Sequence, residues 1–249
     1  MIEAAAPTYS RLYVWGRPVR AFHWVSATCV LALAVTGFII GNPTRIAYAG
    51  EAYQQYWFGS VRFVHFAAGW IFMVAFAARI YWGFVGDRYA RWRHYIPHTK
   101  HQWREIVEVL RVDILQTKAS GEFSAGHNAL AGTTYLISFL VYGFQIATGF
   151  ALYAGMSDSW FPGLFAWVVP LFGGEAGVRF WHHAAMWFFI LFTMIHVYLV
   201  FYHDYVEGRG TTSSMVGGWK FARTATPTPS DEPDEPDEPT EPDEPAGNG

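Results

Sequence analysis

Several histidines lie inside long apolar stretches of the sequence, where a polar side chain is costly and usually serves a function. Imidazole nitrogens bind metal ions and haem iron, and they also carry protons. A single histidine of this kind has an alternative role to metal binding or proton transfer, because it can form a hydrogen bond between two helices. Five together make that alternative weak, and they are His23, His65, His182, His183 and His196.

The spacing of the last three predicts which of them share a helix face. His182 and His196 are 14 residues apart, which on an α-helix is a rise of about 21 Å and a difference in direction of only about 40°. His183 and His196 are 13 residues apart, which turns them about 140° away from each other. We therefore expect His182 and His196 to face one way at two depths, and we do not count His183 as a ligand.

These histidines need elements that position them, and four apolar stretches are long enough to cross a bilayer, which takes about 20 residues. The stretches are residues 21–40, 61–85, 129–154 and 180–202. Lipid offers no partner to unpaired backbone groups, so each stretch should be an α-helix. Only 15% of the chain is charged, well below the roughly 25% of soluble domains. We predict an all-α membrane protein with a four-helix transmembrane bundle over residues 21–203.

The distribution of Lys and Arg predicts the orientation, because basic residues are retained on the cytoplasmic side. Thirteen basic residues lie before the first stretch, between the second and the third, or after the fourth, whereas the opposite side of the membrane has only Arg45, Arg62 and Arg179. We therefore expect a multi-pass protein of the bacterial inner membrane with both termini in the cytoplasm. The parts expected outside the transmembrane helices are a cytoplasmic N-terminal segment (1–20), periplasmic loops (41–60 and 155–179), a cytoplasmic loop (86–128) and a cytoplasmic tail (204–249).

Four segments outside the helices have patterns of their own. Apolar residues recur at helical spacing in residues 101–115, which predicts an amphipathic helix on the membrane surface. Residues 161–172 are apolar but short and contain two prolines, so we expect a loop partly buried in the membrane interface. Repeated Asp-Glu-Pro triplets predict a disordered acidic tail from about residue 224. Residues 1–20 lack a cleavage site after a short apolar core, so we expect no removable signal peptide there.

Cysteine usage limits the redox cofactors that the chain can bind. The single cysteine, Cys29, lies in an apolar run, which excludes disulfides, thiolate zinc sites and iron–sulfur clusters within this chain. The sequence contains no C-x-x-C-H motif, which excludes covalently attached c-type haem. Any haem must therefore be bound without a covalent link.

Depth in the membrane predicts how the histidines pair. The first helix begins at the inner surface and the second at the outer surface, so His23 lies near the inner end and His65 near the outer end. In the fourth helix, His182 lies near the outer side and His196 lies deep toward the inner side. Only His65 with His182 and His23 with His196 are level. Two stacked bis-histidine sites are the arrangement that an electron relay across the bilayer needs, so we predict two non-covalent b haems in the bundle.

Some neighbours of these histidines are candidates for further contacts with haem. Arg20, Arg62 and Arg179 each lie three residues before a predicted ligand, where they could pair with haem propionates. An equal alternative is that they are helix-end anchors whose charged groups reach the membrane surface. Small residues could make room for a porphyrin, although glycine is frequent in membrane helices; they are Gly37, Gly69, Gly143 and Gly149.

The family resemblance described below implies a quinone acceptor near the inner haem, and a quinone site needs a proton donor. The candidates near the cytoplasmic ends of the third and fourth helices are His127, His203 and Asp204. The alternative for each is an ordinary surface residue.

Residues 11–223 resemble the b-type cytochrome subunit of membrane-bound nickel–iron hydrogenases. Two motifs carry the resemblance: residues 20–24 (RAFHW) running on to Thr36-Gly37, and residues 179–183 (RFWHH) running through Trp187 and Phe192 to His196. The family pattern usually has a larger apolar residue in place of Ala21, a small one in place of Phe180 and an aliphatic one in place of Ala184. These departures flank the predicted ligands and leave the ligands themselves intact.

The resemblance implies a membrane anchor that accepts electrons from a hydrogenase whose small and large subunits lie on the periplasmic face. It implies the same four ligands, His23, His65, His182 and His196. Electrons would leave an iron–sulfur cluster of the small subunit, reach the haem of His65 and His182, pass to the haem of His23 and His196, and reduce quinone. The chain is thus expected to be an electron-transfer subunit and not an enzyme on its own. Lipid and quinone are its other expected partners, and nucleic acid is not one.

Three alternatives fit parts of the sequence. The membrane subunit of a formate dehydrogenase or of a thiosulfate reductase would have the same haem chemistry and a different partner, and the pattern R-x-x-H-H-x-x-x-W at residues 179–187 favours hydrogenase. Transport of a proton or metal ion could also use histidines in the membrane, but none of the four stretches contains Asp or Glu. A purely structural anchor would leave the five histidines unexplained.

Overall fold

The computed structural model describes residues 9–43, 56–87, 90–92, 104, 129–207 and 210–223. Within them four helices are long and apolar enough to cross a membrane, which confirms the predicted helical spans. They are α1 (Arg17–Gly41), α2 (Trp57–Val85), α4 (Ala129–Ala154) and α7 (Glu175–Glu207). The predicted surface helix at 101–115 and the predicted disordered tail from about 224 lie outside the described residues, except for Arg104.

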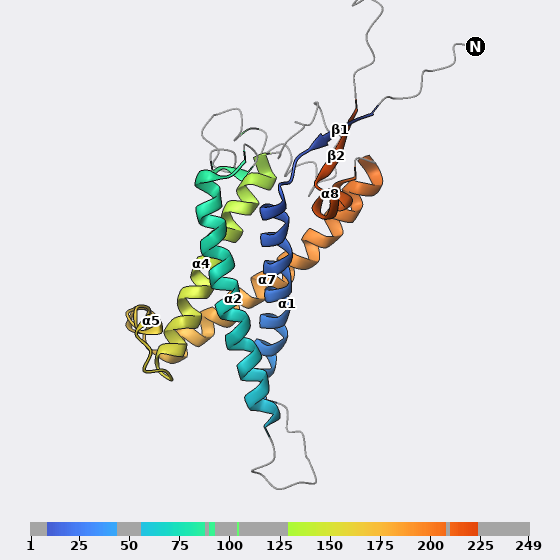
Figure 1. Cartoon of the computed structure of the whole chain (residues 1–249). Helices are drawn as coiled ribbons and strands as arrows, with labels where there is room; N and C mark the ends of the chain where they lie inside the picture. The colour runs from blue at the N-terminus through green and yellow to red at the C-terminus, as the bar shows by residue number, and fades with distance from the viewer. Residues whose placement is uncertain are drawn as a thin grey trace, which may run out of the picture.

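The four long helices form two neighbouring pairs (Figure 1). α1 packs mainly against α2, and α4 packs mainly against α7, with smaller contacts between the pairs. α7 has 33 residues, about 50 Å of helix, which exceeds the roughly 30 Å of a bilayer core. It runs obliquely across the other three helices, so one helix contributes residues at two well-separated levels of the bundle.

Aromatic side chains fill the contact between α2 and α4. The rings of Phe72 and Tyr142 are 4.9 Å apart and perpendicular, and those of Phe76 and Phe139 are 4.7 Å apart. Such pairs add about 0.5–1.5 kcal/mol each beyond their burial. They close one end of the space between the two helix pairs.

Large apolar side chains also cover the outside of the bundle. Phe63, Phe84 and Leu140 are 72%, 70% and 68% exposed. Water-soluble monomers rarely expose wide apolar surfaces of this kind. The outer surface of the bundle therefore suits lipid, as expected for a multi-pass membrane protein.

The segment predicted as a loop at 161–172 contains two short helices instead. They are α5 (Trp160–Gly163) and α6 (Val168–Leu171). Val168 is buried against Ala151 of α4 and Val178 of α7, and this small core fixes the segment on the bundle. Proline is tolerated in the first turn of a helix. Pro162 and Pro170 therefore limit α5 and α6 to one turn each without preventing them.

A two-stranded sheet, which the sequence did not predict, joins the two ends of the described chain. β1 (Tyr9–Tyr13) pairs antiparallel with β2 (Trp219–Arg223), with Tyr9 opposite Arg223 and Tyr13 opposite Trp219. The short helix α8 (Thr211–Gly217) precedes β2. The segments before α1 and after α7 therefore meet at one end of the bundle (Figure 1).

Hydrogen bonds attach α8 to the first turns of α1. The Arg20 guanidinium donates to the carbonyl of Val216, and the Trp24 indole donates to the carbonyl of Met215 at 3.0 Å. Gly218 then turns the chain from α8 into β2 with φ of 90°, and its carbonyl accepts the N–H groups of Val14 and Trp15 at 2.9 and 3.2 Å. Only glycine adopts this backbone conformation without strain.

Replacing Gly218 with Ala should locally unfold this junction. A Cβ at Gly218 would lie 2.6 Å from Tyr13 Cε2 and 2.8 Å from the carbonyl oxygen of Trp15, and a left-handed backbone costs a non-glycine residue about 1–3 kcal/mol. We expect faster amide hydrogen exchange across β1 and β2. Gly217→Ala is the matched control, because a Cβ there meets open space; equal exchange in the two variants would contradict the assigned role of Gly218.

Candidate functional site

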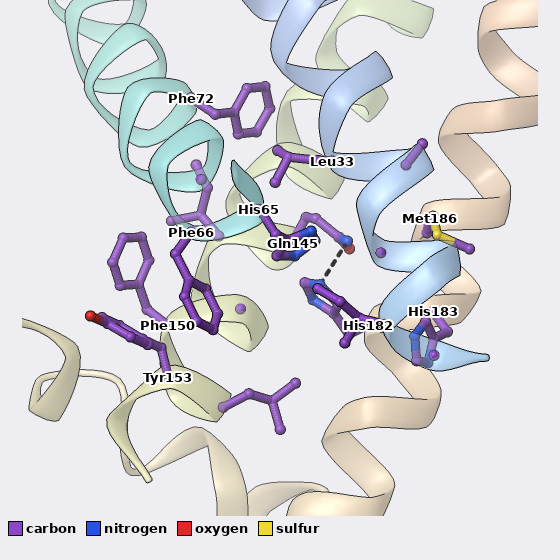
Figure 2. A pocket seen from close by; sticks show the side chains of 18 of the residues that line it. Leu33, His65, Phe66, Phe72, Gln145, Phe150, Tyr153, His182, His183 and Met186 are labelled. Carbon is purple, nitrogen blue, oxygen red and sulfur yellow. Dashed lines mark hydrogen bonds between the residues drawn. The ribbon is translucent and has the colours of Figure 1, made fainter. Parts of the chain in front are cut away.

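A cavity of about 580 Å³ lies between the two helix pairs (Figure 2). This volume is within the roughly 300–1,000 Å³ typical of small-molecule sites. Its wall is mostly apolar, and the polar side chains in it include His65, His182, His183, Gln145, Arg62 and Arg179. An apolar cavity with a few convergent polar groups is the usual form of a cofactor site.

His65 of α2 is fixed against α1. Its Nδ1 lies 2.8 Å from Thr36 Oγ1, and Thr36 Oγ1 donates to the carbonyl of Ala32 at 2.6 Å. The neighbouring Gly37 lies directly beneath the ring, because a Cβ there would be 3.3 Å from His65 Cε1. The ring is therefore in contact with a threonine and a glycine that follow each other in the sequence.

His182 of α7 has the same surroundings on α4. Its Nδ1 lies 2.9 Å from Thr148 Oγ1, and Thr148 Oγ1 donates to the carbonyl of Phe144 at 2.9 Å. A Cβ at Gly149 would be 3.3 Å from His182 Cε1. On its other side, His182 Nε2 is 3.2 Å from the amide nitrogen of Gln145 (Figure 2). We name His65 and His182 the first site.

His23 of α1 and His196 of α7 form a second close pair, which we name the second site. Their ring centroids are 6.3 Å apart and the rings are inclined by 53°. A metal–imidazole bond of roughly 2 Å, added to the roughly 1.1 Å from a nitrogen to the centre of its ring, places two rings on one metal ion about 6 Å apart. The observed spacing fits one iron ion between these two histidines.

His183 lines the same cavity but points away from His182. A Cβ at Gly41 would be 2.8 Å from His183 Nε2, so this imidazole packs against the end of α1. Figure 2 shows His182 turned toward Gln145 and His183 turned toward α1. The side chains of these adjacent residues thus lie in different surroundings, as helical geometry requires of neighbours about 100° apart.

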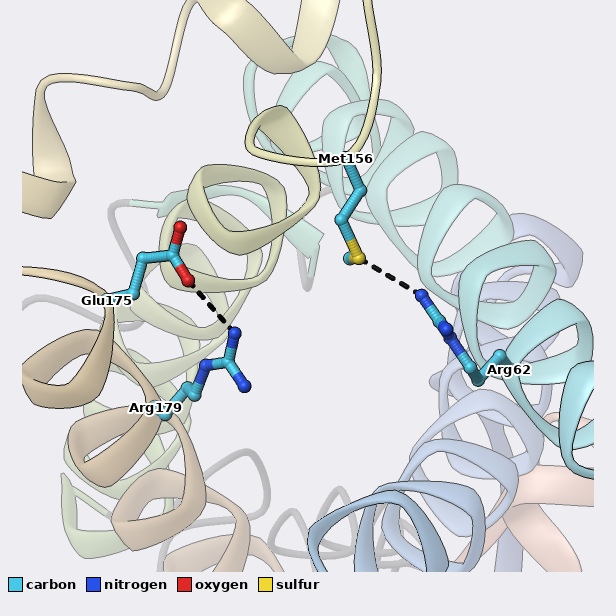
Figure 3. Close-up of polar contacts among 4 residues, drawn as sticks. All are labelled: Arg62, Met156, Glu175 and Arg179. Carbon is cyan, nitrogen blue, oxygen red and sulfur yellow. Dashed lines mark hydrogen bonds and ion pairs between the residues drawn. The ribbon is translucent and has the colours of Figure 1, made fainter.

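Two of the three candidate arginines lie beside the cavity of the first site. Arg62 donates to the Met156 sulfur at 3.1 Å, and Arg179 forms an ion pair with Glu175 at 3.0 Å (Figure 3). Both line the cavity, and the ion pair is exposed, so it stabilises the fold by no more than about 1 kcal/mol. Arg20 lies at the other end of the bundle, where it donates to the carbonyl of Val216.

The quinone candidates are described only in part. His127 lies outside the described residues, and so does the side chain of His203. The carboxylate of Asp204 accepts the backbone N–H of Thr211 at 2.5 Å. Asp204 thus has a structural role at the beginning of α8.

The ligand types available fit haem better than a bare metal ion. Among the described residues no group of three or more His, Cys, Asp or Glu side chains lies close enough to bind a metal ion. Haem brings four nitrogen ligands of its own and needs only one or two side chains, most often histidine. At the first site, Gly69 leaves open space one turn from His65, and the Gln145 amide oxygen is buried without a hydrogen-bond partner in the described part of the chain.

Sequence reasoning missed Thr36, Thr148 and Gln145 as contacts of the histidines. It considered Gly37 and Gly149 only as residues that could make room for a porphyrin, and in the structure a Cβ at either position would meet an imidazole ring. A signal was available, because the tripeptide Thr-Gly-Phe occurs at residues 36–38 and again at 148–150. Its meaning depends on which helix packs beside which, and that requires the structure.

Comparisons with known proteins identify a family and several relatives of this chain. A family model described as prokaryotic cytochrome b561 matches residues 14–218. The chain is similar to a probable Ni/Fe-hydrogenase B-type cytochrome subunit of Azotobacter vinelandii, with 42% identity over 87% of this chain and 91% of the relative. The corresponding protein of Cupriavidus necator is 37% identical over 87% and 90%. The Ni/Fe-hydrogenase 1 B-type cytochrome subunit of Escherichia coli K12 is 35% identical over 84% and 90%.

Replacing Gly69 with Phe should fill the cavity of the first site. A side chain at Gly69 extends into open space that lines the cavity, so a planar group there would be displaced. We expect the purified variant to contain less haem per chain than the unmodified chain, measured from the dithionite-reduced absorption spectrum. Gly59→Phe is the control, because Gly59 also faces open space on α2 but is not part of the cavity. Equal haem content in both variants would argue against this cavity as a haem site.

Proposed function

The chain belongs to the prokaryotic cytochrome b561 family, and from this premise we propose that it is the electron-transferring membrane subunit of a nickel–iron hydrogenase. The observation that carries the proposal is the presence of two histidine pairs at two levels of a helix bundle that suits lipid. The pairs combine His65 of α2 with His182 of α7, and His23 of α1 with His196 of α7. A relay through a bilayer core of about 30 Å needs such stations at different depths.

Four histidines are the proposed axial ligands of two non-covalent b haems. Haem bound at these sites supplies one-electron chemistry through its iron. The chain contributes the imidazole nitrogens, the apolar side chains that exclude water from the first site, and the helices that fix the distance between the two sites. Arg62 and Arg179 are the proposed partners of haem propionates at the first site, because both line its cavity.

Hydrogenase is the proposed electron donor because relatives with 35–42% identity are named as Ni/Fe-hydrogenase cytochrome subunits. The small and large hydrogenase subunits would dock at the end of the bundle that contains the first site. No comparable support exists among these relatives for formate dehydrogenase, the alternative considered from the sequence. The chain would act as an electron-transfer subunit, with hydrogen oxidation occurring on its partner.

The proposed orientation has the first site near the periplasm and the second site near the cytoplasm. The distribution of Lys and Arg supports this orientation. The pairing of β1 with β2 supports a common side for both terminal segments, since it joins residues 9–13 to residues 219–223. Electrons from hydrogen would then reach the first site, continue to the second site and reduce membrane quinone near the inner surface of the bacterial membrane.

Replacing His182 with Leu should remove the haem of the first site and leave that of the second site, because the two proposed ligand sets share no residue. We expect one haem per chain and loss of hydrogen-driven quinone reduction in a complex reconstituted with the hydrogenase subunits. His183→Leu is the matched control, because this neighbouring imidazole packs against Gly41 and is not a proposed ligand. Loss of the His23 and His196 haem in the His182→Leu variant would contradict the pairing, and a chain purified without haem would contradict the function.

Replacing His127 or His203 with Gln should slow quinone reduction if either residue supplies a proton to the quinone. The same reconstituted complex is the system, and hydrogen-driven haem reduction is the internal control because it precedes the quinone step. We expect haem reduction to keep its rate while quinone reduction falls by about a hundredfold or more, the lower range for loss of a proton-transfer group. Unchanged quinone reduction in both variants would exclude these residues.

A further inference from the structure

We propose that Thr36 and Thr148 are positioning residues that fix the tautomer and the ring orientation of His65 and His182, each as part of a repeated Thr-Gly unit. The inference rests on the proposed function, in which these two histidines bind one haem. The two units lie on different helices, α1 and α4, and each contacts the histidine of the helix packed beside it, α2 or α7. α4 contains no proposed ligand, and its Thr-Gly unit gives it a role at the site.

The hydrogen-bond pattern determines where the imidazole protons lie. A hydroxyl group has one proton, and a carbonyl oxygen can only accept. Thr36 gives its proton to Ala32 at 2.6 Å, and Thr148 gives its proton to Phe144 at 2.9 Å. In the proposed arrangement each threonine oxygen accepts from the imidazole, so Nδ1 of His65 and of His182 carries the proton.

The contact between His182 and Gln145 fits the same tautomer. The Gln145 amide nitrogen is 3.2 Å from His182 Nε2, and an NH2 group donates to a nitrogen that has a free lone pair. His182 thus has its proton on Nδ1 and its lone pair on Nε2. The Nε2 lone pair is what an iron ion requires from an axial imidazole, and in both histidines the threonine makes it available.

The glycine of each unit sets the position of the ring. A Cβ at Gly37 or at Gly149 would approach the imidazole Cε1 atom to 3.3 Å, so a larger residue would push the ring off its threonine. Because Thr148 is fully buried and Thr36 is 8% exposed, water does not compete for these hydrogen bonds. The threonine and the glycine together define one ring orientation on each helix.

The two sites differ in whether the Nδ1 atom of a histidine has a hydrogen-bond partner. At the second site His23 Nδ1 is buried and has no hydrogen-bond partner among the described residues. Donation from Nδ1–H to an acceptor increases the basicity of an imidazole ligand and favours oxidised iron. The first site should therefore have the lower midpoint potential, which favours electron flow from the first site to the second.

The test uses full-length chains with Thr36→Val and Thr148→Val, which remove each hydroxyl and nearly preserve shape. Thr36→Ser and Thr148→Ser should restore the hydrogen bonds. Ser138→Ala is the matched control, since the Ser138 hydroxyl is buried on α4 and donates to the Thr134 carbonyl at 2.9 Å, like the two threonines, but contacts no histidine in the described structure. Haem content, the midpoint potential of each haem and the electron paramagnetic resonance of the ferric state are the readouts.

We expect each valine variant to bind the first-site haem about tenfold more weakly, the lower range for loss of a hydrogen bond to a metal-ligating histidine. The midpoint potential of that haem should rise by about 59 mV for each tenfold change in the ratio of oxidised to reduced haem. The second-site haem should keep its potential, and serine should reverse both changes. Ser138→Ala should change neither.

Two results would overturn the proposal. The threonines do not position the ligands if the valine variants keep the haem content, midpoint potential and resonance signal of the Ser138→Ala control. The same holds if serine fails to restore the properties that valine changed. In either case, two haems in the unmodified chain would leave the proposed function standing. If the unmodified chain binds no haem between histidines, the proposed function fails and this inference fails with it.

Discussion

A buried imidazole is stabilised by hydrogen-bond partners on its ring nitrogens, and this interaction explains how the helices pack around the first site. An unpaired polar group in a hydrocarbon environment costs several kcal/mol. At the first site a threonine satisfies Nδ1 of each histidine, and at His182 the Gln145 amide satisfies Nε2. The threonine in turn returns its proton to its own helix, so the hydroxyls of Thr36 and Thr148 are both paired. The two imidazoles of the first site are therefore held in place where one helix packs closely beside another.

Close packing in turn explains the division into helix pairs. α1 supplies the threonine and glycine for the histidine of α2, and α4 supplies them for the histidine of α7. The cavity lies between these two pairs because each pair presents one imidazole toward the other. The long, oblique α7 then reaches a second level, where His196 lies 6.3 Å from His23 between ring centroids. One helix thus connects both sites without a break in its backbone.

The sequence predicted those features that depend on composition and on position along a single helix. The four spans were confirmed because lipid imposes length and apolar character on each of them separately. The side-by-side location of His23 and His196 agrees with an argument from depth and rotation alone, although their role as ligands remains a proposal. The β1–β2 sheet was not predicted because it pairs residues about 200 positions apart, and neither five-residue segment has a strong local pattern. The short helices α5 and α6 were missed because two prolines were weighed above the packing of Val168.

The Thr-Gly units show where sequence reasoning stops and why. Threonine at a helix position is locally neutral, and its hydroxyl normally bonds the carbonyl four residues earlier whatever lies nearby. Nothing in α1 or α4 alone distinguishes Thr36 or Thr148 from Ser138, which forms the same local bond. The difference arises only when a second helix brings an imidazole Nδ1 to the unused lone pair of the hydroxyl. The threonine hydroxyl, whose proton already bonds a carbonyl of its own helix, thereby becomes a fixed acceptor. A fixed acceptor at Nδ1 determines which nitrogen of the histidine faces the cavity.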